Sequence, residues 1–354
     1  MHIRTINKVI FPITIFIIII YNCSENPVNS SDGLFQSISP AEAGFSSTKL
    51  EEVKDFAQSH NYTGIVAVYD GDVFFSWGNV TYNYKCHSIR KPLLGSLYGI
   101  QIDNGNIDIS NTLEDLGIDD SPNALTEPEK QATIRDLLKS MSGVYIEAAY
   151  ETQGAKDTRP ERGSHDPGTY FYYNNWDFNT LGTIFEEETG TAIFEEFKNQ
   201  IAGPIGMEDF NVNNCEYIYE LDLSQHPAYT FRMSTRDMAR FGVLHQQDGN
   251  WDGDQIISNN WISESTTTYA IGDSTLGLGY GYLWATIPEG SPASQIIGTT
   301  GYYHSGAGGH LLLVLPSMKL VIVERINTDG NYVVDPGDAM MQIAKMIIDA
   351  KMVS

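Results

Sequence analysis

Residues 88–102 read SIRKPLLGSLYGIQI and are the most informative part of this chain of 354 residues. Apolar side chains recur there at helical spacing, which predicts a helix that begins near Ser88 and turns one apolar face to a core. Pro92 fits such a helix only near its start, where the missing N–H removes no helical hydrogen bond. The stretch therefore predicts that Ser88 lies at the beginning of a buried helix.

Ser88 and Lys91 lie three positions apart, so their side chains share one face of the predicted helix and the amine can reach the hydroxyl. A buried lysine loses its charge readily and can then accept the proton of a serine. The helix N-terminus would also stabilise negative charge that develops beside Ser88. Ser88 and Lys91 are candidates for a nucleophile and its base, although an ordinary N-cap at Ser88 explains the pair alone equally well.

The Ser-x-x-Lys pattern occurs a second time, in Ser46-Ser47-Thr48-Lys49. This copy opens a segment with helical apolar spacing, residues 46–60, and acidic residues follow in its first turns. Serine is a common N-cap residue. We therefore interpret the first copy as a helix start and the second as the chemically relevant one.

Two further motifs follow Ser88 along the chain. Tyr173-Asn174-Asn175 has the form Tyr-x-Asn, and His304-Ser305-Gly306 has the form His-x-Gly and is followed by Ala307. In this order the three motifs resemble those of the β-lactamase-like serine hydrolases. That family includes class C β-lactamases, D-alanyl-D-alanine carboxypeptidases, other penicillin-binding proteins, esterases and 6-aminohexanoate-dimer hydrolases. The resemblance extends over about residues 40–350.

The resemblance implies a role for each motif residue. Ser88 is expected to attack a carbonyl and become acylated, while Lys91 and Tyr173 share the proton transfers, the phenol acting as phenolate or as a relay. His304 is expected on a strand beside the leaving group. The backbone N–H groups of Ser88 and Ala307 are the implied oxyanion hole.

The remaining motif residues are expected to contact the substrate. Asn175 would hydrogen-bond Lys91 or a substrate amide, Ser305 would contact the substrate, and Gly306 would leave room for it along the strand. Simpler interpretations remain open for the aromatic members of the motifs. Tyr173 can be an ordinary aromatic residue, Tyr172 also begins a match to Tyr-x-Asn, and His304 can be a structural strand histidine.

Strand-like and helix-like segments are distributed unevenly along the chain. Strands are predicted near both ends, at 64–69, 73–77, 280–287, 310–315 and 319–326. Helices are predicted at 46–60, 134–140, 179–188, 193–201, 235–246 and 338–351. The sequence thus predicts an α/β (α+β) fold of the β-lactamase-like kind, in which both chain ends build an antiparallel sheet with flanking helices and a large helical insertion, about 110–270.

The N-terminus is typical of an export signal. His2, Arg4 and Lys8 precede a nearly unbroken apolar run, residues 9–20, which predicts a signal peptide over 1–22. The following Cys23 lies in a segment that resembles a bacterial lipobox, so we expect a lipid anchor at Cys23 and a location in the cell envelope or periplasm.

A small residue is usual where Asn22 stands, and a plain cleaved signal or an uncleaved anchor is the alternative to lipidation. Residues 23–36 are predicted to be a flexible tether and residues 37–354 to be the hydrolase domain.

The charge balance limits the choice of partners. The chain has 21 Lys and Arg residues against 45 Asp and Glu residues, for a net charge of −24. This charge repels phosphate backbones, so no nucleic-acid partner is expected, and a membrane is expected as a partner only through Cys23.

Metal and disulfide chemistry have little support in the sequence. The eight histidines form no His-x-His or His-Glu-x-x-His pair, so neither a metal nor another cofactor is expected. Apart from Cys23, only Cys86 and Cys215 are present, and whether they pair is open.

The predicted function is a serine hydrolase that cleaves an amide or ester bond. Expected substrates are D-amino-acid peptides, linear amides or small esters. The alternative is a penicillin-type binding or sensor domain that reacts once or not at all. Arg159, Arg162 and His165 precede the Tyr-x-Asn motif and can either meet an anionic substrate or be surface residues.

Overall fold

The computed structural model describes residues 34–330 and 338–352. The predicted signal peptide, Cys23 and most of the predicted tether lie outside these residues. The last three tether positions, 34–36, belong instead to the fold. The Phe35 N–H donates to the Gly71 carbonyl over 2.8 Å, and the Gln36 N–H donates to Asp72 Oδ1 over 3.0 Å. These bonds hold the segment 34–36 against the first hairpin.

The main sheet of the described residues has eight strands in the order β2-β1-β14-β13-β12-β11-β10-β9, and every neighbouring pair is antiparallel. Its strands are β1 (Tyr62–Tyr69), β2 (Asp72–Gly78), β9 (Ala270–Asp273), β10 (Leu278–Tyr280), β11 (Ala285–Ile287), β12 (Gly301–Gly306), β13 (His310–Leu315) and β14 (Leu320–Ile326). The N-terminal hairpin pairs with the last strand of the chain, which confirms a sheet assembled from both ends.

Side chains alternate between the two faces of this sheet, as the pleat of a strand requires. In β1, Ile65 faces one apolar core and Val66 faces the other. Leu313 of β13 lies on the same side as Ile65, and Val314 lies on the side of Val66. Both faces are therefore covered, and each strand contributes to two cores at once.

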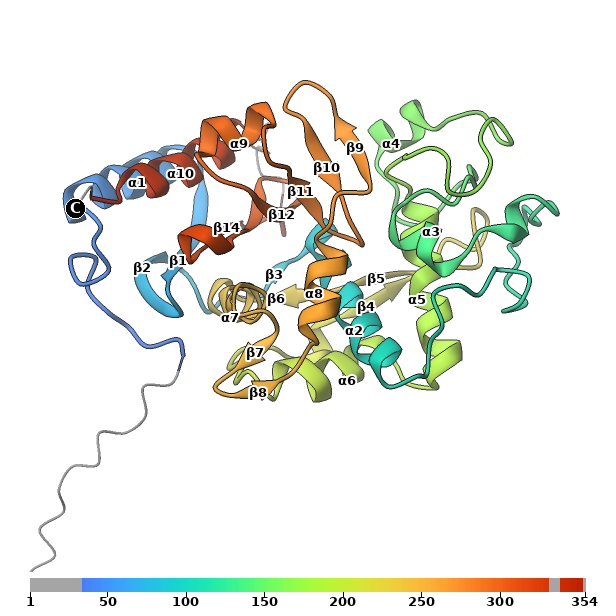
Figure 1. Ribbon diagram of the computed structural model, residues 1–354, viewed down its shortest axis with the longest axis horizontal. Coiled ribbons are helices and arrows are strands. Elements are labelled where there is room, and N and C mark those ends of the chain that lie inside the picture. Colours follow the sequence, from blue (N-terminus) through green and yellow to red (C-terminus); the bar gives the residue numbers. More distant parts are fainter. Residues whose placement is uncertain (1–33, 331–337, 353–354) are drawn as a thin grey trace, which may run out of the picture. The chain divides into compact units, whose positions relative to one another are not determined.

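The α-helices of the described residues are α1 (Ser47–Ser59), α2 (Arg90–Asp103), α3 (Ile134–Leu138), α4 (Gln153–Thr158), α5 (Asn175–Thr189), α6 (Ile193–Phe197), α7 (Thr235–Gln246), α8 (Asn259–Ser265), α9 (Pro292–Ile297) and α10 (Asp338–Asp349). Some of them cover the two faces of the sheet. Helices α1 and α10 lie side by side on one face, and α7, from the helical insertion, packs on the other (Figure 1).

Short strands in pairs also occur outside the main sheet. They are β3 (Tyr84–Lys85) with β6 (Arg232–Met233), β4 (Glu216–Ile218) with β5 (Ala228–Thr230), and β7 (Asn250–Trp251) with β8 (Asp254–Gln255). The predicted helical insertion is therefore mainly helix and loop, with these small ribbons among its helices.

Most predicted elements are present, and the differences have local causes. The helix predicted at 235–246 has those bounds in α7. The strand predicted at 280–287 is wrong, because the chain turns between β10 and β11, where the Gly281 N–H donates to the Trp284 carbonyl over 2.8 Å. Helices α8 and α9 and strand β9 were not predicted, since segments of four to seven residues are too short to show a period.

The first Ser-x-x-Lys copy begins a helix. Ser46 is the N-cap of α1, and its hydroxyl accepts a hydrogen bond from the Lys49 N–H over 3.4 Å. The Lys49 amine donates to the Asp349 carbonyl near the end of α10 over 2.6 Å, away from Ser46. The interpretation of this copy as a helix start is confirmed.

Three further features of the described residues bear on the sequence analysis. Cys86 is buried, Cys215 is partly exposed, and both are free thiols. Within 34–330 and 338–352, no group of three or more His, Cys, Asp or Glu side chains is placed to hold a metal ion. No helix in the same ranges combines the length and the apolar character needed to cross a membrane.

Candidate active site

Ser88 lies in a short 3-10 turn, His87–Ile89, that leads directly into α2. The N-cap of α2 is Ile89, and no side chain caps the helix, so an N-cap role does not explain Ser88. Lys91 follows in the first turn of α2, and its Nζ donates to Ser88 Oγ over 3.0 Å. The structure therefore brings the predicted nucleophile and base into direct contact.

Aromatic rings and the apolar core enclose the amine of Lys91. The residue is 1% exposed, and its Nζ lies 4.7 Å from the centre of the Tyr173 ring and 4.5 Å from that of Phe178. Burial, and next the positive charge of Arg90, hold the pKa of Lys91 well below its ordinary 10.5. A lysine in this state can take up the proton of Ser88.

Tyr173 lies against the same pair, in the loop before α5. It lines two cavities together with Ser88, and burial raises the pKa of Tyr173 above the ordinary value of 10.0. The phenol thus stays protonated near neutral pH, which favours a proton relay over a phenolate. Tyr172 is directed elsewhere, because its hydroxyl donates to the Ala155 carbonyl over 2.6 Å. The register that begins at Tyr173 is the one that meets Ser88.

His304 lies on β12, on the other side of Tyr173. The two ring centres are 6.3 Å apart, and His304 is 4% exposed. Burial, followed by the charge of Lys91, lowers the pKa of His304 to about 3, so the ring is neutral.

The tautomer of His304 follows from its one hydrogen bond. Its Nδ1 lies 2.9 Å from the Ser305 carbonyl, an acceptor, so Nδ1 carries the proton and donates it. Nε2 is left as an acceptor, buried and without a hydrogen-bond partner among the described residues. His304 therefore offers an acceptor to the cleft and no positive charge.

Two cavities share Ser88, Tyr173 and Ala307 as lining residues. The first has a volume of about 310 Å³ and is also lined by His87, Arg90, Lys91, Tyr150, Glu151, Thr152, Ala155 and Asn175. The second has a volume of about 440 Å³ and is also lined by Phe171, Gly272, Asp273, Leu278, Gly279, Tyr280, Ala285, Tyr303, His304, Ser305 and Gly306. A substrate whose carbonyl lies at Ser88 can thus place one part in each cavity.

The predicted substrate-contacting residues divide between these cavities. Asn175, the first residue of α5, lines the first cavity, and Ser305 and Gly306 line the second. Among the described residues, Lys91 Nζ donates to Ser88 and makes no hydrogen bond with Asn175. Asn175 was predicted to hydrogen-bond either Lys91 or a substrate amide. Its position in the lining of the first cavity leaves the contact with a substrate amide as the role to be tested.

Gly306 has a packing role that the sequence analysis missed. A Cβ at this position would lie 2.9 Å from the Cys86 carbonyl oxygen and 3.3 Å from Cβ of His87. The glycine thus lets β12 approach the turn that carries Ser88, in addition to the room it was predicted to leave for a substrate.

Arg325 of β14 holds the chain that enters the Ser88 turn, and sequence reasoning did not identify it. Its Nη2 donates to the carbonyls of Tyr84 and Lys85 over 3.1 and 2.9 Å, and its Nε donates to His310 Nδ1 over 3.1 Å. The side chain is fully buried. No local pattern marks this residue, because the two carbonyls that it binds are about 240 positions away in the chain.

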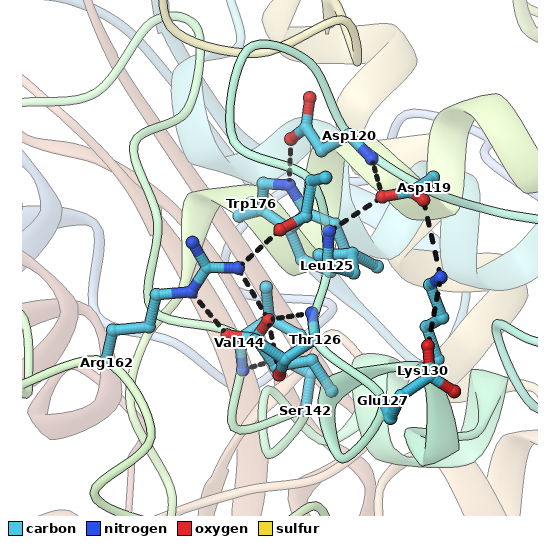
Figure 2. Close-up of polar contacts among 12 residues, drawn as sticks. Asp119, Asp120, Leu125, Thr126, Glu127, Lys130, Ser142, Val144, Arg162 and Trp176 are labelled. Atoms are coloured by element: carbon cyan, nitrogen blue, oxygen red, sulfur yellow. Dashed lines mark hydrogen bonds and ion pairs between the residues drawn. The ribbon is translucent and has the colours of Figure 1, made fainter.

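The cations that precede the Tyr-x-Asn motif are already paired. The Arg162 guanidinium donates to the carboxylate of Glu129 over 2.8 and 2.7 Å and to the Ala124 carbonyl over 2.7 Å. The dashed lines at Arg162 in Figure 2 mark these polar contacts. Arg159 forms an ion pair with the buried carboxylate of Glu151. The His165 ring stacks on Tyr170 with 4.0 Å between ring centres. Internal pairing therefore accounts for both arginines, and neither is a free anion site.

We predict that Gly306→Ala slows acylation of Ser88 by a fluorophosphonate about tenfold to a hundredfold. The added methyl group would push β12 away from the Ser88 turn, and displacements of about 1 Å in a reacting site have effects of this size. The measurement is the second-order labelling rate, with the melting temperature recorded to check folding. Gly154→Ala is the control, because its Cβ would meet nothing within 4 Å. Labelling of Gly306→Ala at the parent rate would contradict the packing role.

Comparison with known proteins agrees with this geometry. The chain matches the beta-lactamase family over residues 64–344. No curated protein sequence matches it.

Solved structures share the fold at low sequence identity. A Bacillus anthracis protein provisionally named as a 6-aminohexanoate-dimer hydrolase is 20% identical, with a TM-score of 0.63 over 89% of this chain and 86% of that one. A penicillin-binding protein homologue from Pyrococcus abyssi is 18% identical, with a TM-score of 0.61 over 84% and 75%. A class C β-lactamase is 13% identical, with a TM-score of 0.62 over 87% and 96%. Because the family match covers most of the chain and the fold agrees, this protein belongs to the beta-lactamase family of serine β-lactamases and penicillin-binding proteins.

Proposed function

We propose that this protein hydrolyses an amide or ester bond through an acyl-enzyme on Ser88. The observation that carries the proposal is the 3.0 Å hydrogen bond from the buried Lys91 amine to Ser88 Oγ. Family membership and a hydrolase among the structural relatives support a serine hydrolase in general. The acyl-enzyme and the substrate are the parts that the proposal adds.

Acylation begins when Ser88 Oγ attacks the carbonyl carbon of the substrate. As the C–O bond forms, the hydroxyl proton passes to Lys91 Nζ, and the N–H groups of Ser88 and Ala307 stabilise the oxyanion. Collapse of the tetrahedral intermediate breaks the bond to the leaving amine or alcohol. The leaving group takes a proton through the Tyr173 hydroxyl, which Lys91 reprotonates.

Deacylation repeats these steps with water as the nucleophile. Water gives a proton to Lys91 through Tyr173 and attacks the ester carbonyl. The bond from the acyl carbon to Ser88 Oγ then breaks, Oγ takes the proton back from Lys91, and the acid is released. His304 lies near the leaving-group side, where its Nε2 can accept a hydrogen bond from a substrate N–H or O–H.

The proposed substrates are D-amino-acid peptides, linear amides or small esters. Cavities of about 310 and 440 Å³ on the two sides of Ser88 suit an acyl part and a leaving group of a few residues or carbons each. The neutral His304 lacks the fixed charge that a lysine would offer to a substrate carboxylate in the second cavity. This difference favours linear amides and esters over penicillins.

We predict that a fluorophosphonate forms one adduct with the purified protein and none with Ser88→Ala. The reagent is attacked by an activated serine, and Lys91 activates only Ser88 in this way. Intact mass after incubation is the measurement. The control is Ser46→Ala, which removes the serine of the other Ser-x-x-Lys copy and should keep the adduct. A folded parent protein without an adduct would overturn the hydrolase proposal in favour of a binding domain, and an adduct would justify turnover assays with amides, esters and penicillins.

The labelling rate should also report the state of Lys91. Because the pKa of Lys91 lies well below 10.5, its amine is the free base over a wide range, and activity is lost only as the pH falls through the lowered pKa. We expect the labelling rate to reach its plateau well below pH 10.5 and to stay level at alkaline pH. Lys91→Arg, which keeps the charge, should lower it by about a hundredfold to ten-thousandfold. A rate that climbs steadily towards pH 10.5 would contradict the assignment of Lys91 as base.

We also propose that the protein is exported and lipid-anchored through Cys23. The basic and apolar residues of the first 22 positions and the following cysteine support this proposal. In a bacterial host, the full chain should fractionate with membranes, and Cys23→Ser should appear in the soluble periplasmic fraction. Equal distributions of the two proteins would argue against lipidation and for a plain signal or an uncleaved anchor.

A further inference from the structure

Arg90, the residue before the base Lys91, lines the first cavity together with Ser88. Its side chain is 2% exposed. The Nη2 donates to Asn179 Oδ1 over 3.0 Å, and the guanidinium lies 4.3 Å from the centre of the Tyr229 ring. Both neighbours are neutral, and they hold the guanidinium in a defined position.

The second terminal nitrogen of Arg90 is different. Nη1 is buried and has no hydrogen-bond partner among the described residues, and no carboxylate of residues 34–330 and 338–352 forms an ion pair with Arg90. A buried charge without a partner is costly, and proteins usually pair such a group or use it to bind a ligand. An arginine guanidinium is suited to bind a carboxylate.

The other charged groups of the cavity are compensated or neutral. Glu151 is paired with Arg159, so that pair contributes no net charge. Burial lowers the pKa of His87 to about 4, so its ring is neutral near neutral pH, and burial holds the pKa of Lys91 well below 10.5, which favours its uncharged form. Among the residues that line the first cavity, this leaves the positive charge of Arg90 uncompensated, within a chain whose net charge is −24.

We infer that the first cavity is a subsite for an anionic acyl group, in which the guanidinium of Arg90 binds a carboxylate carried by the acyl part of the substrate. The inference rests on the proposed function, which places the leaving group beside His304 in the second cavity and hence the acyl part in the first. It narrows the substrate class to amides or esters of acids that carry a second carboxylate. Binding of an anionic substrate, a role that the sequence analysis considered for Arg159 and Arg162, is thus assigned to Arg90 of the Ser-x-x-Lys motif.

The test is protection of Ser88 from a neutral fluorophosphonate by matched ligands, with the full-length protein. The ligands are the monoamides of straight-chain dicarboxylic acids, from succinate to suberate, and the corresponding neutral diamides. At least one monoamide should halve the labelling rate at a concentration about tenfold to a hundredfold lower than its diamide, the range expected for a charge-assisted hydrogen bond. Equal protection by every monoamide and its diamide would overturn the inference.

Substitutions of Arg90 test whether this residue causes the preference for monoamides over diamides. Arg90→Gln should reduce the ratio between monoamide and diamide to about one, and Arg90→Lys should retain part of it, because it keeps the charge without the planar donors. Lys345→Gln is the control, since it removes the same charge from the exposed face of α10. A preference that persists in Arg90→Gln would also overturn the inference.

Failure of the proposed function can be distinguished from failure of this subsite. If the parent protein is not labelled at all, the hydrolase proposal fails. The same ligands are then titrated into the parent and Arg90→Gln by calorimetry, because carboxylate binding at Arg90 does not need a reactive Ser88. Tighter binding of a monoamide to the parent alone would support the subsite, and equal binding would overturn it.

Discussion

The hydrogen bond between Lys91 Nζ and Ser88 Oγ is the contact on which the chemistry of the cleft depends. It joins a nucleophile to a base only while the amine is dry, because water would restore its charge and its ordinary pKa. The rings of Tyr173 and Phe178 and the apolar environment of α2 provide that dry site. Burial thus keeps the Lys91 amine in its free-base form, and mutations that admit water would restore its charge before they unfold the protein.

The turn that presents Ser88 is held from two directions by the sheet. Arg325 of β14 binds the carbonyls just before the turn, and Gly306 of β12 lets that strand approach the turn closely. Strand β14 pairs with β1, so two segments about 250 positions apart in the sequence must pair before the nucleophile is in place. The position of Ser88 is therefore a property of the whole sheet and depends on contacts remote in sequence.

Charge is distributed unevenly between the surface and the cleft. The chain as a whole is strongly acidic, yet the first cavity contains an arginine with no carboxylate partner among the described residues, while the two arginines nearer the Tyr-x-Asn motif are neutralised by Glu129 and Glu151. The negative field of the whole protein would slow the approach of an anionic substrate. A cation inside the cavity must therefore provide the attraction that holds the substrate once it is bound. The proposed recognition of the acyl part and the uncharged state of Lys91 are coupled, since the charge of Arg90 also lowers the pKa of Lys91.

The sequence by itself determined the order of the chemical motifs and the class of the fold. Ser88 and Lys91 are one helical turn apart, and helical geometry alone makes their contact predictable. Alternating strands at both ends and a mainly helical middle were sufficient to predict the antiparallel sheet, because those periods are local properties of the chain. The short elements α8, α9 and β9 carry too few residues for any period to show.

Only the tertiary structure decided which residues share the cleft, which of them are charged and which have partners. Several properties of the cleft depend on neighbours that are distant in sequence. They include the choice of Tyr173 over Tyr172 and the neutral form of His304. The pairing of Arg162 with Glu129 and the lack of a partner for Arg90 Nη1 among the described residues depend on such neighbours too. Burial and pairing are properties of the folded surroundings, and they set both the pKa of a group and its freedom to bind. A sequence pattern specifies which groups are present, whereas their charge and partners follow from packing.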